Sequence, residues 1–227
     1  MRLGLGLHVR AVKLLERFGR WRRQRARIEP IRQHIDRLHI GCGPQALAGW
    51  TNVDIEFFPG VDVVRDVRDG LPFTGARYVY AEHFIEHLTY DEALRFLKEC
   101  RAALRDDGVL RVSTPNLDWV LETHYRGPER VGICFAINKA FRGWGHQFLY
   151  NEETLVATLQ AAGFAEVKFF AYGKSDDPVL TGIERHETYP DEPGMPHVLV
   201  AEARGRRASS TDAIEVIIDE YDRALRS

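Results

Sequence analysis

Strands and helices alternate along residues 36–204, and this alternation restricts the fold more than any other feature of the chain. Short apolar runs bounded by Gly, Pro and Asp predict seven strands. These runs are residues 38–40, 51–55, 61–64, 77–81, 109–113, 166–171 and 197–202. The alternation predicts an α/β domain with a doubly wound, mostly parallel seven-stranded sheet and helices on both faces.

Two helices have clear limits in the sequence. Residues 91–104 are amphipathic, with leucines spaced to face inward. A later helix begins after Asn151, whose side chain can cap it, and carries two glutamates in its first turn. Gly163 ends this second helix, because glycine readily adopts the left-handed conformation found after helix C-termini.

Two connections are longer than this pattern requires. Residues 118–150 form an insertion with seven aromatic side chains, which suits either packing or a lid over a ligand. Residues 173–196 form a long polar connection before the last strand. Connections of this length in a compact domain usually carry function or are disordered.

The composition is that of a soluble globular protein. Of the 227 residues, 44% are hydrophobic and 28% charged. No apolar run approaches the ~18 residues of a membrane span, and arginines interrupt the N-terminus where a signal peptide would be apolar. The cysteines, Cys42, Cys100 and Cys134, form no C-x-x-C pair, so we expect a reducing, cytoplasmic compartment and no disulfide framework.

Charge is distributed unevenly along the chain. Residues 1–34 contain ten Lys or Arg and two Glu, a charge of +8; since the net charge is −2, the rest carries −10. We expect residues 1–35 to form a basic helical arm that either docks on the domain or contacts an anionic partner such as a membrane surface. Residues 205–227 predict an amphipathic helix that docks on the domain or pairs with a second copy of the chain.

Three features, in sequence order, indicate a nucleoside site. The first strand runs into Gly41-Cys42-Gly43, where missing side chains let a ligand approach the backbone. The second strand ends at Asp54, whose carboxylate can accept both hydroxyls of a ribose. Asp66 follows the third strand and can accept the amino group of adenine. Asp54 alone would more simply cap a helix or a turn. The third glycine of the dinucleotide-binding fingerprint is missing, which argues against a nicotinamide enzyme.

Together with the run Ala-Glu-His-Phe-Ile-Glu-His-Leu at 81–88, these motifs resemble the class I (Rossmann-like) S-adenosylmethionine-dependent methyltransferases. The resemblance extends through residues 108–116, 146–155 and 162–164, and covers about residues 36–204. Its nearest subgroup is the compact one associated with surface-polysaccharide biosynthesis. It implies a methyltransferase domain over 36–204, with S-adenosyl-L-methionine as cofactor and S-adenosyl-L-homocysteine as product.

The resemblance also implies roles for particular residues. Those expected to bind the cofactor are Gly41, Cys42, Gly43, Asp54, Ile55, Asp66, Val67 and Glu82. Glu82 and His83 would border the transferred methyl group. His83 is the first candidate for the general base that removes a proton from the acceptor, and His146 and Tyr150 of the aromatic insertion are further candidates.

The chain departs from the family pattern at three points. His39 stands where an acid usually precedes the first glycine. Arg77 stands where an aspartate usually opens the fourth strand. The segment between Gly43 and the second strand is short, so we expect the first helix to be stunted or absent.

Two other functions fit parts of the sequence. The run His83-Phe-Ile-Glu86-His87 matches H-x-x-E-H, in which two histidines on one helical face bind zinc and the glutamate activates water in hydrolases. Its place directly after a strand, inside a nucleoside-binding pattern, favours a structural role for Glu86 and His87, and no metal is expected. A non-catalytic nucleoside-binding module is the other alternative.

The expected activity is methyl transfer to an oxygen of a small-molecule or glycan acceptor. The aromatic insertion favours a sugar, because aromatic faces suit sugar rings. The basic arm would bring the enzyme to a membrane-bound, phosphate-linked glycan. Nucleic acid is not an expected partner, since the acidic body of the domain repels phosphates.

Overall fold

The computed structural model describes residues 33–124, 126, 129–186, 189–208 and 210. The chain divides into two compact units, Met1–Arg32 and Gln33–Ser227. The basic helix expected within 1–35 lies outside the described residues, apart from 33–35, which belong to the second unit. The C-terminal helix expected within 205–227 also lies outside them, apart from 205–208 and 210.

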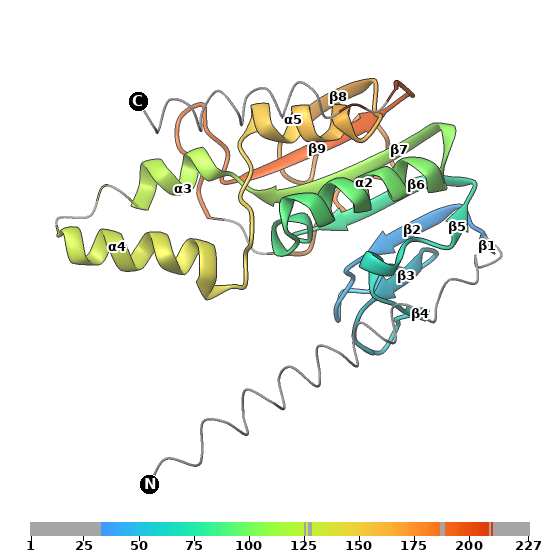
Figure 1. The fold of residues 1–227 in the computed structure, drawn as a ribbon, viewed down its shortest axis with the longest axis horizontal. Coiled ribbons are helices and arrows are strands. Elements are labelled where there is room, and N and C mark those ends of the chain that lie inside the picture. The colour runs from blue at the N-terminus through green and yellow to red at the C-terminus, as the bar shows by residue number, and fades with distance from the viewer. Residues whose placement is uncertain (1–32, 125, 127–128, 187–188, 209, 211–227) are drawn as a thin grey trace, which may run out of the picture. The chain divides into compact units, whose positions relative to one another are not determined.

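Seven strands form one sheet in the order β4-β3-β2-β6-β7-β9-β8 (Figure 1). They are β2 (Arg37–Ile40), β3 (Thr51–Asp54), β4 (Val63–Val64), β6 (Ala76–Glu82), β7 (Leu104–Pro115), β8 (Glu166–Phe170) and β9 (Val198–Arg204). Each coincides with a strand expected from the sequence. Neighbours are parallel except in the two pairs that β9 makes, so β9 runs against the other six. The sheet is therefore mixed and mostly parallel, as predicted.

Helices α2 (Tyr90–Ala103) and α5 (Glu152–Ala161) confirm the two helix predictions. A capping box starts α2: the Thr89 side chain accepts the N–H of Glu92, and the Glu92 side chain accepts the N–H of Thr89. Asn151 caps α5 by accepting the N–H of Thr154 at 3.0 Å. Gly163, with a φ of 104°, follows α5 as expected.

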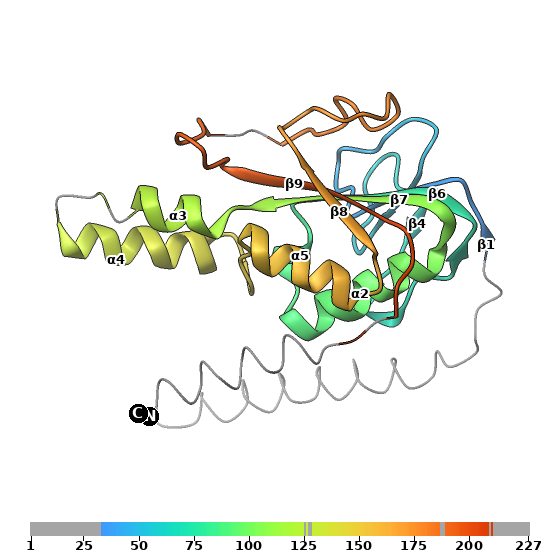
Figure 2. The same cartoon turned by 90° about the horizontal axis from the view of Figure 1, so that it is seen from above.

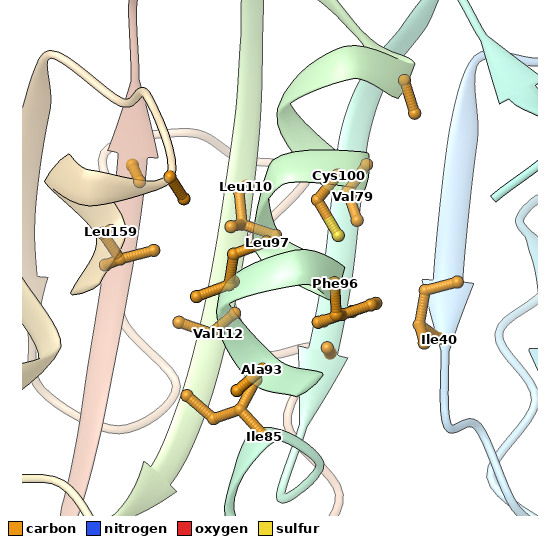
Figure 3. Packing of buried hydrophobic residues seen from close by; sticks show 14 of the residues in the cluster. Ile40, Val79, Ile85, Ala93, Phe96, Leu97, Cys100, Leu110, Val112 and Leu159 are labelled. Atoms are coloured by element: carbon orange, nitrogen blue, oxygen red, sulfur yellow. The ribbon is translucent and has the colours of Figure 1, made fainter. Parts of the chain in front are cut away.

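The main hydrophobic core lies between these two helices and one face of the sheet (Figure 3). The side chains in contact there include Phe96, Leu97 and Cys100 of α2, Leu159 of α5, Ile40 of β2, Val79 of β6, and Leu110 and Val112 of β7. Each large aliphatic or aromatic side chain buried in this way contributes about 1.5–3 kcal/mol to folding. This layer holds the strands in register and so fixes where their ends lie.

In the part of the chain that the structure describes, loops rather than helices cover the opposite face of the sheet (Figure 2). Tyr78 and Tyr80 of β6 point to this side and pack against Trp50, Leu180 and Ile183, all from loops. The expectation of helices on both faces is therefore wrong for these residues. The segment between β2 and β3 is too short for a helix, as its length indicated, and the segment after β8 is polar.

A buried asparagine fastens the first of these loops. The Asn52 side chain in β3 accepts the N–H of Leu47 at 2.8 Å and donates to the carbonyl oxygens of Leu47 and Trp50 at 3.0 and 3.1 Å. Buried amide groups need such partners, because an unpaired one costs free energy. Asn52 thus stabilises the loop that replaces the first helix.

The aromatic insertion at 118–150 folds mainly as helices. These are α3 (Leu117–His124), α4 (Arg130–Asn138) and a π-helical turn, η3 (Lys139–Gly143). Figures 1 and 2 show α3 and α4 side by side beyond the end of β7. A separate small core, made by Trp119, Val120, Ala140 and Leu149, packs α3 against η3 and the segment before α5.

The smaller elements complete the second unit. Strands β1 (Gln33–His34) and β5 (Phe73–Thr74) form a two-stranded parallel sheet that was not expected. Two single turns, η1 (Val67–Asp69) and η2 (Ile85–His87), follow β4 and β6. Among the helices within the described residues, none has both the length and the apolar character to span a bilayer.

Candidate active site

The carboxyl ends of β2, β3 and β6 lie at one edge of the sheet, because these strands are parallel neighbours. Open α/β sheets bind their ligands at this edge. Residues 41–43, Asp54 and His83 end or directly follow these strands. The fold therefore brings together three groups that the sequence singled out.

Gly41 and Gly43 form the turn that ends β2. Their φ angles are +65° and +48°, a conformation that favours glycine. A Cβ on Gly41 would lie 2.4 Å from the ring of Phe84, whereas a Cβ on Gly43 would point into open space. Between them Cys42 is buried, and burial raises the pKa of its thiol to about 11, so the thiol stays protonated. The open side of Gly43 lets a ligand come up to the backbone.

Asp54 links the end of β3 to this glycine turn. Its Oδ2 accepts the N–H of Gly43 at 2.8 Å, and its Oδ1 accepts the N–H of Glu56 at 2.9 Å. The contact with Glu56 is the turn cap that an isolated acid would make, whereas the contact with Gly43 ties the carboxylate to the predicted site. Each oxygen keeps a further lone pair. The next residue, Ile55, is 57% exposed and adds apolar surface at the same edge.

Asp66 caps a turn in the structure. Its carboxylate accepts the backbone N–H of Arg68 at 3.0 Å and lies 2.7 Å from the guanidinium of the same residue. Val67, which begins η1, is buried. These contacts account for Asp66 without a ligand, and a role of Asp66 and Val67 in binding adenine stays a prediction.

His39, which replaces the expected acid before the glycine turn, has packing contacts. It is buried in β2, its Nδ1 lies 3.1 Å from Asn52 Oδ1, and its ring stacks on Tyr80 at 5.0 Å. Burial lowers the pKa of His39 and the hydrogen bond with Asn52 offsets this only in part, so the ring is neutral at pH 7. His39 stabilises the loop between β2 and β3 and brings no charge to the sheet edge.

Glu82, at the end of β6, anchors a loop. Its carboxylate accepts the N–H groups of Arg185 and His186 at 2.9 and 3.0 Å, and the Nδ1 atom of His186 lies 3.3 Å away. Burial alone would raise the pKa of Glu82, but the hydrogen bonds from His186 and Arg185 outweigh it and lower the pKa to about 2. Glu82 thus fixes residues 185–186 at the sheet edge, and contact with the cofactor stays a prediction.

A buried ion pair between β7 and Glu184 fastens the same loop to the sheet. The guanidinium of Arg111 in β7 lies 2.6 Å from Glu184 and 2.9 Å from Glu202, and all three side chains are almost completely buried. A broken pair of this kind costs about 3–5 kcal/mol, because one charge is left uncompensated. The contacts of Glu82 with residues 185–186 and of Arg111 with Glu184 together place His186 beside His83, and their ring centroids lie 4.8 Å apart.

His83 is oriented by Glu86. His83 has a φ of 46°, unusual for a residue with a side chain, and its Nδ1 lies 3.1 Å from Glu86 Oε1. Glu86 is fully buried and also accepts the Thr114 hydroxyl at 3.1 Å. Burial would raise the pKa of Glu86, but the contact with His83 outweighs it and lowers the pKa, so the carboxylate is ionised. An ionised carboxylate only accepts, so the proton sits on Nδ1 of His83. Nε2 is then the nitrogen with a free lone pair; it is buried and has no partner among the residues that the structure describes.

His83 lies in the wall of a cavity of about 910 Å³. Helices α3 and α4, η3 and the segment before β9 supply the other walls. Among the residues that the structure describes, six histidines line it: His83, His87, His124, His146, His186 and His197. Three aromatic side chains (Trp119, Trp144, Tyr189) and Lys139 add ring faces and a positive charge.

The two further candidates for the base lie in different surroundings. His146 is in the cavity wall, its Nδ1 lies 2.7 Å from the carbonyl oxygen of Ala140, and burial lowers its pKa. Tyr150 is fully buried in the main core and does not line the cavity; its hydroxyl has no partner in the described residues. The structure therefore brings His83 and His146 to one cavity and leaves Tyr150 outside it.

Among the cavity residues that the sequence analysis did not single out are three histidines. His124, His186 and His197 come from three segments far apart in the chain, and no spacing pattern links them. His124 and His186 do lie in the two long connections at 118–150 and 173–196. The length of those connections was the only indication that they carry function.

The H-x-x-E-H run does not form the helical zinc motif of hydrolases. His83 precedes η2, which is a single turn, and Glu86 binds His83 directly. Glu86 instead approaches two other histidines: one ligand atom each of Glu86, His87 and His146 lie within 4.8 Å of one another. These three residues are the ones that could hold a metal in the described part of the chain.

No protein-family model and no curated protein sequence matches the chain. Solved structures do resemble it. The structure of PigF with S-adenosylhomocysteine is 14% identical, with a TM-score of 0.45, over 76% of this chain and 50% of PigF. An S-adenosylmethionine-dependent methyltransferase of Thermotoga maritima is 20% identical, with a TM-score of 0.49, over 75% of this chain and 82% of that protein.

The S-adenosylmethionine-dependent methyltransferase SibL, solved in its apo form, is 17% identical, with a TM-score of 0.50, over 80% of this chain and 53% of SibL. The chain spans about half the length of PigF and of SibL. At this level of identity the likeness shows the fold alone. The second unit of the chain therefore has the Rossmann-like fold of an S-adenosylmethionine-dependent methyltransferase.

Proposed function

We propose that the chain is an enzyme that transfers a methyl group from S-adenosylmethionine to a hydroxyl oxygen of an acceptor bound in the cavity. One observation carries this proposal: the glycine turn, Asp54 and His83 lie at the ends of three neighbouring parallel strands, and His83 is also part of the cavity wall. A nucleoside at the sheet edge would thus adjoin an acceptor in the cavity. The fold shared with SibL supports the proposal.

The side chains at the sheet edge fit the adenosine part of this cofactor. A Cβ on Gly43 would occupy open space, and without it a ligand can lie directly against the backbone. Asp54 can accept the two ribose hydroxyls with its remaining lone pairs. The exposed side chain of Ile55 offers an apolar surface to the adenine ring. Asp66, Val67 and Glu82 would complete the site from η1 and β6.

S-adenosylmethionine supplies a methyl group on a positively charged sulfur and leaves as S-adenosylhomocysteine. The protein then has to align the acceptor and take up its hydroxyl proton. We assign the proton to Nε2 of His83, with Glu86 stabilising the charged ring through Nδ1. The acceptor oxygen forms a bond to the methyl carbon as the carbon–sulfur bond breaks. His146 is the second candidate for the base, and Tyr150 is left out because its hydroxyl lies in the core.

The cavity favours an acceptor with ring faces and a negative group. Aromatic side chains such as Trp119 and Trp144 suit the faces of sugar rings, and Lys139 with the histidines suits a phosphate. We therefore propose a phosphate-linked glycan, methylated on the cytoplasmic side of a membrane. The basic arm at 1–35 would contact that membrane, and the helix at 205–227 would pair two copies of the chain. Nucleic acid is not part of this proposal.

The test is calorimetric titration of the purified chain with S-adenosylhomocysteine. We expect one molecule bound per chain. Asp54→Ala should weaken binding at least about 100-fold, because two hydrogen bonds to a charged group contribute about 1.5–3 kcal/mol each. Glu56→Ala, which removes the neighbouring exposed carboxylate, is the matched control and should bind as the unchanged chain does.

Two results would count against the proposal. Equal affinity in the Asp54→Ala variant, with its unfolding curve unchanged, would show that the nucleoside does not bind at this edge. Binding without methyl transfer to any of a panel of sugar phosphates would instead favour a non-catalytic nucleoside-binding module.

A further inference from the structure

We propose that Glu86, His87 and His146 bind one divalent transition-metal ion, Zn²⁺ by their chemistry, in the wall of the cavity. Imidazole nitrogens and a carboxylate oxygen are preferred ligands of zinc. One ligand atom from each of the three side chains lies within 4.8 Å of the other two, and Glu86 and His146 are buried. His87 and His146 also line the cavity.

Hydrogen bonds join the two segments that carry these residues. The carbonyl oxygen of Glu86 accepts the N–H groups of Gln147 and Phe148 at 2.7 and 3.2 Å. The Gln147 side chain donates to the carbonyl oxygen of His87 at 2.7 Å. Residues 60 positions apart are thereby held together without any ion. A site built this way is preorganised, which reduces the entropy lost when a metal binds.

Two of the three side chains already have the supporting contacts typical of metal ligands. Nδ1 of His146 lies 2.7 Å from the carbonyl oxygen of Ala140. A carbonyl oxygen only accepts, so Nδ1 carries the proton and Nε2 presents its lone pair. Metal-binding histidines almost always donate their other ring N–H in this manner. Glu86 is held through one hydrogen bond on each oxygen, from His83 and Thr114, and each oxygen retains a lone pair.

The ligand atoms of Glu86, His87 and His146 have to move only slightly closer together to bind one zinc ion. Ligand atoms around tetrahedral zinc lie about 3.4 Å apart when the bonds are about 2.1 Å long. Here every pair of ligand atoms lies within 4.8 Å, so no pair has to come closer by more than about 1.4 Å. His87 is exposed and its ring centroid lies 5.0 Å from that of His146, so rotation of His87 can bring its nitrogen inward.

Two histidines and one glutamate leave a fourth position open. Catalytic zinc sites have three protein ligands and a fourth place for water or substrate, whereas structural sites are closed. On the proposed function, an acceptor hydroxyl would take the fourth place from the cavity. A hydroxyl bound to zinc loses its proton at lower pH than a free one. The site would thus activate the acceptor for methyl transfer and would not hydrolyse peptides.

The experiment measures metal binding by the full chain, without a polyhistidine tag and after dialysis against a chelator. Zn²⁺ is titrated by calorimetry, and Co²⁺ is added to report ligand geometry by its visible spectrum. We expect one ion per chain and a tetrahedral Co²⁺ spectrum. Glu86→Gln, His87→Ala and His146→Ala should each weaken binding by more than about 100-fold, beyond the effect of losing a supporting contact.

His124→Ala is the matched control, because His124 lines the same cavity outside the three-residue group. Its metal affinity should equal that of the unchanged chain. His87 is exposed, so His87→Ala should fold normally even if the two buried variants do not. Absence of Zn²⁺ and Co²⁺ binding, or unchanged affinity in His87→Ala, would overturn the proposal.

The metal titration contains no nucleoside, and the S-adenosylhomocysteine titration uses the metal-free chain. Either result can therefore fail alone. If no metal binds, the proposed metal site is wrong, and His83 can still act as the base without it. If S-adenosylhomocysteine does not bind, the proposed methyltransferase activity is wrong, and the metal site is unaffected.

Discussion

Gly41 and Gly43 share a backbone conformation but differ in what surrounds them. Alanine at either position has to adopt a positive φ, which costs about 1–2 kcal/mol. Gly41→Ala must also displace the ring of Phe84, whereas Gly43→Ala meets no atom within 4 Å. We expect Gly43→Ala to lose about 1 kcal/mol of unfolding free energy and Gly41→Ala clearly more, measured by urea unfolding.

A double-mutant cycle separates the two causes. Phe84→Ala should remove the extra loss seen in Gly41→Ala and leave the cost of the positive φ. If Gly41→Ala and Gly43→Ala were equally destabilised, the close contact with Phe84 would not hold the turn in place.

Individual residues were predictable from the sequence where the backbone decides their position. Asp54 and the glycine turn lie at one edge because β2 and β3 are parallel neighbours, and the carboxyl ends of parallel strands meet at the same edge. The partners of these residues were not predictable. Glu82 accepts hydrogen bonds from Arg185 and His186, which lie more than 100 positions further along the chain, and no sequence pattern indicated this contact.

At the scale of elements, three sets of contacts fasten the loop after β8 to the sheet. Glu82 fastens residues 185–186 from the sheet edge, and Arg111 fastens Glu184 from within the sheet. Tyr78 of β6 adds a third contact by donating its hydroxyl to Asp177 at 2.7 Å. These contacts explain how a polar connection of about two dozen residues can supply an ordered cavity wall.

The contact between Glu82 and His186 depends on pH. The hydrogen bond that the His186 ring donates to Glu82 raises the pKa of His186 above its ordinary 6.5. The stabilising effect of this bond is complete below 6.5 and is lost as pH rises through the raised value. The pKa of Glu82 is lowered from 4.5 to about 2, so its own contribution is complete above 4.5 and is lost as pH falls toward 2. The pair is therefore strongest between these limits, at pH 4.5–6.5.

Glu82→Gln should lower the titration midpoint of His186 toward 6.5, as followed by NMR of the histidine rings. It should also destabilise the chain more at pH 6 than at pH 8.5, because at the higher pH the His186 ring is neutral in both proteins. Glu56→Gln, at an exposed position, serves as the control. A His186 midpoint unchanged by Glu82→Gln would show that the two side chains are not in contact.

The helices and strands were predictable because burial on one side leaves a periodic pattern. Residues 90–103 show this well: the buried side chains of α2 recur at helical spacing, and Thr89 and Glu92 form a recognisable start. The loops that cover the other face of the sheet were not predictable, since Tyr78 and Tyr80 are buried whether a helix or a loop covers them. Their apolar character indicates that this face is buried, but it does not indicate whether a helix or a loop covers it.

At the scale of the whole molecule, the sheet, its cores and the cavity all belong to the second unit. Removal of residues 1–32, which hold ten basic and two acidic side chains, should leave affinity for S-adenosylhomocysteine unchanged. It should abolish sedimentation with vesicles of anionic lipid, because each basic residue near such a surface contributes about 1 kcal/mol. Raising the salt concentration should weaken binding of the full chain in the same assay.

If the shortened chain still sediments with the vesicles, the membrane contact lies outside residues 1–32. A fall in S-adenosylhomocysteine affinity would show that the arm contributes to the nucleoside site.

The central claim is that an adenosine group binds at the carboxyl edge of β2, β3 and β6, with its sulfur toward the cavity. A crystal structure of the full chain with S-adenosylhomocysteine tests it most directly. The account predicts ribose hydroxyls within hydrogen-bond distance of Asp54, the nucleoside against the open side of Gly43, and the sulfur facing His83. A nucleoside bound elsewhere, with Asp54 still bonded only to Gly43 and Glu56, would contradict it.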